Sequence, residues 1–164
     1  MKLHLDVQYA CKQRGLPSRA AIAKWARAAL VGVRRVNIEL SLRIVNDTEG
    51  ARLNKKFRGK HGATNVLSFP CSDAFGRRHG LLGDIVICAS VVAREASAQN
   101  KAQTAHWAHM VVHAIMHLRG YDHLTGADAK TMVAREVRVL KNLGFSDPYR
   151  ATPDNEPRRR HRKR

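Results

Sequence analysis

The chain has 164 residues, 44% of them apolar and 26% charged, and this composition suits one domain with a single core rather than a disordered chain. No apolar run approaches the roughly 20 residues of a membrane span, and the N-terminus carries no recognisable signal peptide. Three widely spaced cysteines, Cys11, Cys71 and Cys88, exclude a disulfide framework. We therefore expect a protein of the reducing cytoplasm without a membrane partner.

The charge of the chain is strongly one-sided. Thirty Lys and Arg stand against 13 Asp and Glu, which gives a net charge of +17. Six of these cations lie in the last seven residues, and without them 24 cations still face 13 acids. Such a surplus repels itself in a compact fold and favours a polyanionic partner such as nucleic acid. A protein that is merely basic is the open alternative.

The N-terminal part of the chain predicts two strands with a helix between them. Polar and apolar residues alternate over residues 2–9 and again over residues 36–44, as expected for half-buried strands. Pro17 and Ser18 have the composition of a helix start, so the intervening segment is predicted to be helical.

A second helix is predicted to follow the second strand. Asn46 and Glu49 have the spacing of a capping box, and Leu53 and Phe57 are expected to face inward from this helix. Residues 72–83 hold three glycines and two arginines and are expected to form a mobile loop. The remaining pattern predicts two strands, at residues 66–69 and 85–88, and three helices, at residues 89–100, 104–120 and 125–143.

These elements indicate an α+β fold. We expect a single domain over residues 1–150, with a small mixed sheet of about four strands packed with about five helices. Residues 151–164 contain two prolines followed by the basic run, which predicts a disordered tail.

Histidines gather on the predicted helix 104–120. His106, His109, His113 and His117 fall within about 80° of one another on a helical wheel, and most of the other positions are apolar. A helix of this composition is expected to be buried. Buried imidazoles must then be satisfied by hydrogen bonds, water or a metal.

Three of the histidines have metal-ligand spacing. His113 and His117 stand one helical turn apart, and Gly120 allows the helix to stop so that His123 can return to the same point. Three imidazoles with an open fourth position are typical of a catalytic zinc site, with nickel, cobalt or copper as alternatives. A metalloprotease of the HExxH type would need Glu where Ala114 stands, which argues against such a peptidase.

Residues 113–123 read HAIMHLRGYDH and resemble the signature HGxLHLxGYDH of the YbeY family, bacterial endoribonucleases of ribosomal RNA maturation. Further blocks resemble the family in the same order: FRGK at 57–60, TNVLSFP at 64–70, LGDIVIC at 82–88 and LGFSDPY at 143–149. The resemblance covers about residues 1–150. Ala114 replaces the usual glycine, and the tail 151–164 has no counterpart in the family.

The resemblance implies an endoribonuclease that hydrolyses single-stranded RNA, with one zinc ion on His113, His117 and His123 and with Arg58 needed for activity. A guanidinium can hold two non-bridging phosphate oxygens, so the role of Arg58 is chemically reasonable. The resemblance also implies maturation of the 3′ end of small-subunit ribosomal RNA. The partners would be the small ribosomal subunit, a ribosomal protein and an assembly GTPase, and the tail is expected to strengthen binding to RNA phosphates.

Three further residues have two interpretations each. Asp84 and Asp122 either orient a ligand histidine or serve a local turn, and His109 is expected to be a buried structural or pocket-lining residue. Two other functions also remain open: a zinc hydrolase of another substrate class, and a non-enzymatic ribosome-assembly factor with a structural metal. The basic charge of residues 1–150 favours RNA over a peptide or small ester.

Overall fold

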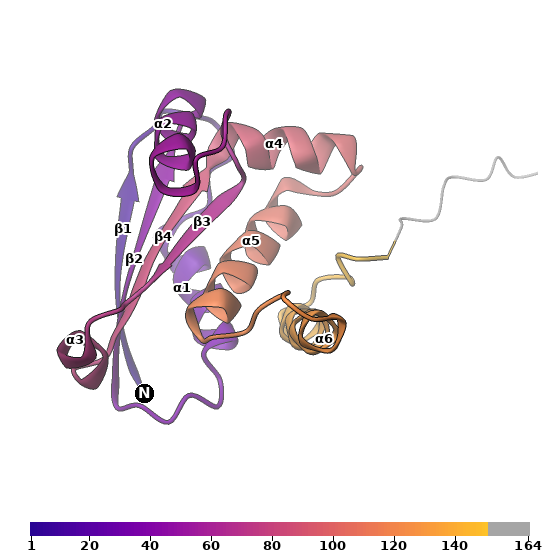
Figure 1. Ribbon diagram of the computed structural model, residues 1–164. Coiled ribbons are helices and arrows are strands. Elements are labelled where there is room, and N and C mark those ends of the chain that lie inside the picture. The colour runs from indigo at the N-terminus through magenta and orange to yellow at the C-terminus, as the bar shows by residue number, and fades with distance from the viewer. Residues whose placement is uncertain (151–164) are drawn as a thin grey trace, which may run out of the picture.

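A mixed sheet of four strands forms the frame of the structure, a computed structural model that describes residues 1–150 (Figure 1). The spatial order of the strands is β1 (Lys2–Tyr9), β2 (Asn37–Val45), β4 (Leu81–Cys88) and β3 (Val66–Pro70). The first three are parallel, and β3 runs antiparallel to β4 at one edge. The predicted tail, residues 151–164, lies outside the described residues.

Six helices complete the described part of the chain: α1 (Arg19–Ala29), α2 (Asp47–Arg58), α3 (Ala74–Arg78), α4 (Ala89–Ala98), α5 (Gln103–Leu118) and α6 (Gly126–Asn142). Side-chain caps begin three of the longer helices: Ser18, Asn46 and Thr125 each accept a bond from a backbone N–H of the first turn. Within residues 1–150, no helix has the length and apolarity that crossing a membrane requires. The predicted α+β class and mixed sheet are confirmed.

Helix α5 is the centre of the core. It lies against one face of the sheet, with α1 and α6 packed on its other sides (Figure 1). Because nearly all of its surface is covered, even His106 and His109 are buried among its apolar side chains, as the helical wheel predicts. The last turn of α5 reaches the edge strand β3, and this is where the helix meets solvent.

Two local predictions are wrong. Residues 72–83 are not a mobile loop, because Asp73 caps the short helix α3 and β4 already begins at Leu81. Phe57 does not face inward: it is 53% exposed and packs edge-on against the ring of Phe69. The buried position on that part of α2 is Asn54, whose side chain donates to the carbonyl of Gly62 at 2.8 Å.

Gly83 permits the close contact of β4 with its neighbours. Its φ of +147° is a conformation that favours glycine, and an added Cβ would collide with the carbonyl oxygen of Phe69 and lie 3.0 Å from Cδ2 of Leu118. We expect Gly83→Ala to lower the free energy of unfolding by about 2–3 kcal/mol, measured by urea denaturation.

The matched control is Gly126→Ala at the start of α6, where an added Cβ meets open space. This variant should match the wild type to within about 1 kcal/mol or gain stability, because alanine favours the helix. Equal unfolding free energies for the two variants would contradict the packing role of Gly83.

Candidate metal centre

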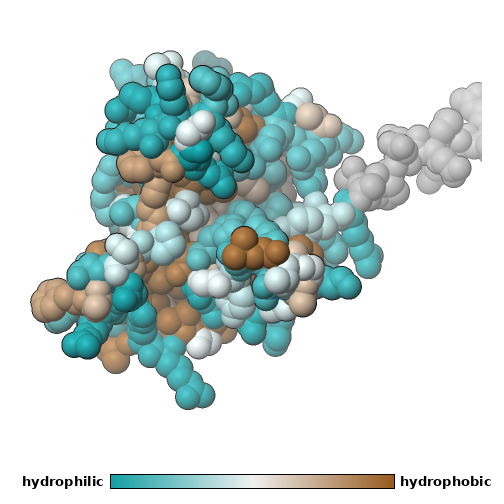
Figure 2. All heavy atoms as spheres, viewed as in Figure 1, coloured by the Kyte–Doolittle hydropathy of each residue, from teal (hydrophilic) through white to brown (hydrophobic). Residues whose placement is uncertain are grey.

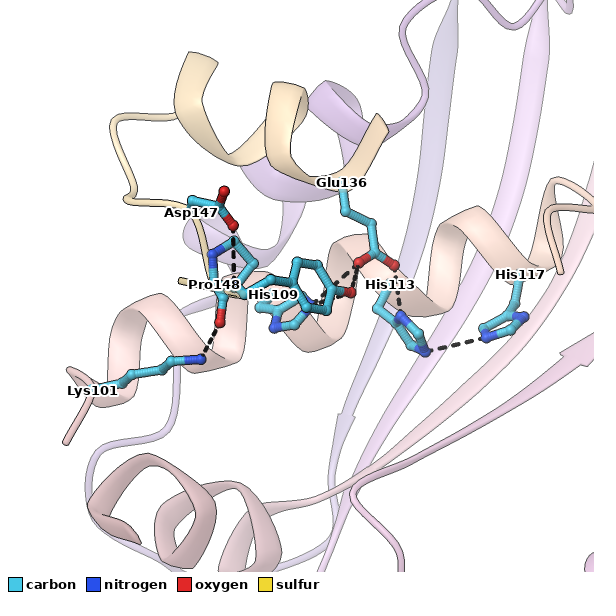
Figure 3. A network of polar contacts seen from close by, with 8 residues as sticks. Lys101, His109, His113, His117, Glu136, Asp147 and Pro148 are labelled. Atoms are coloured by element: carbon cyan, nitrogen blue, oxygen red, sulfur yellow. Dashed lines mark hydrogen bonds and ion pairs between the residues drawn. The ribbon is translucent and has the colours of Figure 1, made fainter. Parts of the chain in front are cut away.

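Three imidazoles meet where α5 ends. His113 and His117 come from the last turns of α5 and His123 from the loop that follows, and each offers a nitrogen within 4.8 Å of the others. Nε2 of His113 and Nε2 of His117 are 3.1 Å apart (Figure 3). Two nitrogens bound to one tetrahedral ion at 2.0–2.1 Å would be about 3.3 Å apart, so these donors fit a zinc-sized ion.

The turn after α5 brings His123 back to the helix. Gly120 has a φ of +92°, and its N–H and that of Tyr121 donate to the last carbonyls of α5. The carboxylate of Asp122 accepts the backbone N–H of His123 at 2.6 Å. Asp122 therefore shapes the turn that carries the third imidazole.

A buried carboxylate supports His113 from behind. Glu136 on α6 has no exposed surface, and its Oε1 accepts a hydrogen bond from Nδ1 of His113 at 2.6 Å (Figure 3). A proton held on Nδ1 leaves the lone pair of Nε2 directed toward His117, which is the form of imidazole that binds a metal.

The Glu136 carboxylate also contacts His109 and Tyr149, which lies near the end of the described chain. Its Oε2 lies 3.3 Å from Nε2 of His109 and accepts the hydroxyl of Tyr149. His109, His113 and Glu136 also lie close enough together to hold an ion, but the hydrogen bonds between them already account for the contacts. His109 is thus a buried residue of the support, in agreement with its spacing.

The pKa shifts of Glu136, Tyr149 and His117 agree with these contacts. Burial by itself would raise the pKa of Glu136, but hydrogen bonds from His109, His113 and Tyr149 outweigh it and lower the pKa from 4.5 to about 2. Burial and the bond to Glu136 raise the pKa of the Tyr149 hydroxyl. Burial and the neighbouring imidazoles lower the pKa of His117, which favours the neutral ring that a metal requires.

Two of the three imidazoles, His113 and His117, open into a cleft of about 470 Å³ beside the edge strand β3. Its walls include His113 and His117 on one side, and Phe57 and Arg58 from the end of α2 on the other. Gly59, with a φ of +66°, ends α2 immediately after Arg58. The fold therefore brings Arg58 to the same cleft as imidazoles more than 50 residues away.

The structure places Asp84 away from this cleft. Its carboxylate accepts the hydroxyl of Ser41 on β2, whereas the buried Ile85 and Ile87 take the opposite, core-facing side of β4. Asp84 therefore joins two strands on the outer face of the sheet, and the interpretation that it orients a ligand histidine has no support in these contacts.

Sequence reasoning missed Glu136 and Tyr149. A signal for Glu136 was present, because it lies four residues from Met132 and four from Leu140, and all three are buried on one face of α6. An acid in such an apolar stripe needs a buried partner. Tyr149 lies in the block 143–149 that resembles the family, but no periodicity placed it beside α5, since it follows the last helix.

The chain was compared with known proteins. The family model "Endoribonuclease YbeY" matches residues 8–144. Three proteins named Endoribonuclease YbeY are similar: one from Nitrosococcus oceani is 44% identical, covering 91% of this chain and 98% of its own. Those from Methylococcus capsulatus and Nitrosospira multiformis are 51% and 48% identical, covering 82% and 90% of this chain and 88% and 82% of their own.

A solved structure supports the fold. The solution structure of a Thermotoga maritima protein matches with a TM-score of 0.56 and 21% identity, over 88% of this chain and 99% of that one. At this identity the likeness concerns the architecture of sheet and helices alone.

The lowered pKa of Glu136 predicts a pH-dependent contribution to stability. Ionised Glu136 stabilises the fold fully above pH 4.5, and this contribution is lost as the pH falls toward 2. In metal-free protein, the unfolding free energy of wild type minus that of Glu136→Gln should therefore shrink by about 2–3 kcal/mol across this range in urea titrations.

The control is Glu39→Gln on an exposed position of β2, whose difference from wild type should be small at every pH. A difference for Glu136→Gln that stays constant with pH would show that the ionised carboxylate is not the stabilising form.

Proposed function

Because the chain belongs to the YbeY family of endoribonucleases, we propose that it cleaves single-stranded RNA in the cleft beside β3. In this proposal His113, His117 and His123 hold one catalytic zinc ion, and Arg58 binds the scissile phosphate. The observation that carries the proposal is that an exposed arginine lines the same open cleft as His113 and His117, two members of the three-imidazole group.

Arg58 and Glu136 have different roles in this proposal. The guanidinium of Arg58 can donate two hydrogen bonds to non-bridging phosphate oxygens and stabilise the charge that develops on them. Glu136 holds the proton on Nδ1 of His113 and thereby keeps Nε2 available as a donor to the ion. When bound, the ion would supply Lewis-acid chemistry at the phosphate.

Two alternatives receive less support. A structural metal is normally closed by a fourth protein ligand, whereas the group at this site contains three side chains among residues 1–150 and borders an open cleft. A zinc hydrolase for peptides or small esters would not need the large surplus of cations that the chain carries.

We further propose that the substrate is ribosomal RNA at the 3′ end of the small subunit, processed in the cytoplasm. The small ribosomal subunit, a ribosomal protein and an assembly GTPase would be the partners. The support for this context is the resemblance in sequence and the net charge of +17. Three free cysteines agree with a reducing compartment.

Metal content tests the ligand set. Wild-type protein should bind one zinc ion per chain, and His117→Ala should lose this ion and the cleavage of RNA, because two imidazoles hold zinc far more weakly than three. Elemental analysis after dialysis measures the first effect and a gel assay the second.

The matched control is His4→Ala at an exposed position of β1, which should keep both metal and activity. Full metal content in His117→Ala would contradict the ligand assignment.

Arg58→Ala should lower kcat/KM for RNA cleavage by an amount equal to about 2–4 kcal/mol of transition-state stabilisation, with metal content and fold unchanged. Arg58→Lys should restore only part of the lost kcat/KM, because an ammonium group cannot present two parallel donors. Lys55→Ala removes a charge from the same last turn of α2 outside the cleft and serves as the control. Equal losses of kcat/KM in Arg58→Ala and Lys55→Ala would show that Arg58 acts only through its general surface charge.

A further inference from the structure

A second concave surface lies just beyond the end of β3, at the amino ends of β2 and β4. This basic pocket, of about 790 Å³, is formed where the segment before β2 meets α3, and its basic lining residues are Arg34, Arg35, Arg77, Arg78 and His79. All five are exposed, and no acidic side chain lines the pocket within residues 1–150. Four permanent cations so close together repel one another, and an anion relieves that repulsion.

The backbone holds the two halves of the basic pocket together. Gly80, with a φ of +99°, lets the end of α3 approach the start of β2, where an added Cβ would collide with the carbonyl oxygen of Asn37. The carbonyl of Gly80 also accepts the N–H of Glu39 at 2.9 Å. Arg77 and Arg78 are therefore kept beside Arg34 and Arg35 by the fold itself.

An exposed aromatic ring stands next to these arginines. Phe75 on α3 is 69% exposed, and its inner face packs on the ring of His79 at a centroid distance of 4.0 Å. Figure 2 shows a light brown, hydrophobic group that projects from the surface at the place of α3. Proteins that bind single-stranded nucleic acids combine an aromatic ring with several cations. The bases stack on the ring, and the cations bind the phosphates.

The basic pocket lies close to the cleft. Pro70 lines the cleft and Ala74 lines the basic pocket, so only residues 71–73 separate them along the chain, a span of at most about 14 Å. A nucleic acid strand lying along β3 from the imidazoles thus reaches α3 within a few nucleotides.

We infer that the basic pocket and Phe75 form a second binding site for the RNA substrate, which holds the strand where it leaves the metal-bearing cleft. Arg34, Arg35 and Arg78 bind phosphates, and Phe75 stacks on one base. This inference rests on the proposed function, since it assigns the strand in the cleft as RNA. It predicts that long RNA gains affinity that a short RNA confined to the cleft does not.

The test compares two lengths of labelled single-stranded RNA, of about 5 and about 20 nucleotides, by fluorescence anisotropy on mixing, before cleavage proceeds. The triple variant Arg34→Gln/Arg35→Gln/Arg78→Gln should bind the long RNA at least about tenfold more weakly at low salt. Its slope of log affinity against log salt should be flatter by about 2, because three phosphate contacts are lost. Binding and cleavage of the short RNA should match wild type.

The control Lys130→Gln/Arg138→Gln/Lys141→Gln removes the same charge from exposed positions of α6, which lies away from α3 (Figure 1). Its affinity for long RNA should stay near that of wild type. If both triple variants bind long RNA equally weakly, or if the first variant loses the same affinity for short and long RNA, the inference is overturned. The effect would then come from the general charge of the protein. Wild-type affinity and slope in the first variant would overturn it in favour of an acidic protein partner.

Phe75→Ala separates stacking from charge. It should weaken binding of the long RNA by about fivefold or more while leaving the salt slope unchanged, because no cation is removed. Unchanged affinity would exclude the stacking role of Phe75. Wild-type protein that cleaves neither RNA would refute the proposed function itself, whereas normal cleavage with unaltered binding in these variants refutes only the second site.

Discussion

The carboxylate of Glu136 is ionised at neutral pH although none of its surface reaches solvent, and much of the C-terminal half is arranged to satisfy it. A buried charge is costly unless hydrogen bonds replace the water it has lost. Here the donors come from His109 and His113 on α5 and from Tyr149 beyond α6. This one carboxylate therefore links α6 to α5 and to the segment that follows α6, and it orients the His113 ring.

This support lies on one side of the imidazoles, and the open cleft lies on the other. Helix α5 is buried over most of its length, so its rings can turn toward solvent only at its C-terminal end. The edge strand β3 provides the opposite wall, and Arg58 reaches it from the end of α2. A rigid, hydrogen-bonded base with an exposed rim is suited to hold an ion in fixed geometry while a long, flexible substrate enters.

A group of cations lies near the cleft. The short helix α3 carries Arg77 and Arg78 to the start of β2, where they meet Arg34 and Arg35. A prediction of a mobile loop for residues 72–83 overlooked this role, because glycines that look like signs of flexibility are used here for close packing of the backbone. Asp73 as a helix cap was the local signal of order.

Local patterns in the sequence determined the strands, the longer helices, the burial of α5 and the grouping of His113, His117 and His123, since the helical repeat and one glycine turn act over at most about ten residues. The tertiary structure alone decided that Arg58 shares a cleft with His113 and His117, that Asp84 faces the other side of the sheet and that Glu136 lies behind His113. These contacts join segments that are distant in the chain. They depend on the strand order β1-β2-β4-β3 and on how helices pack over it, which no local periodicity encodes.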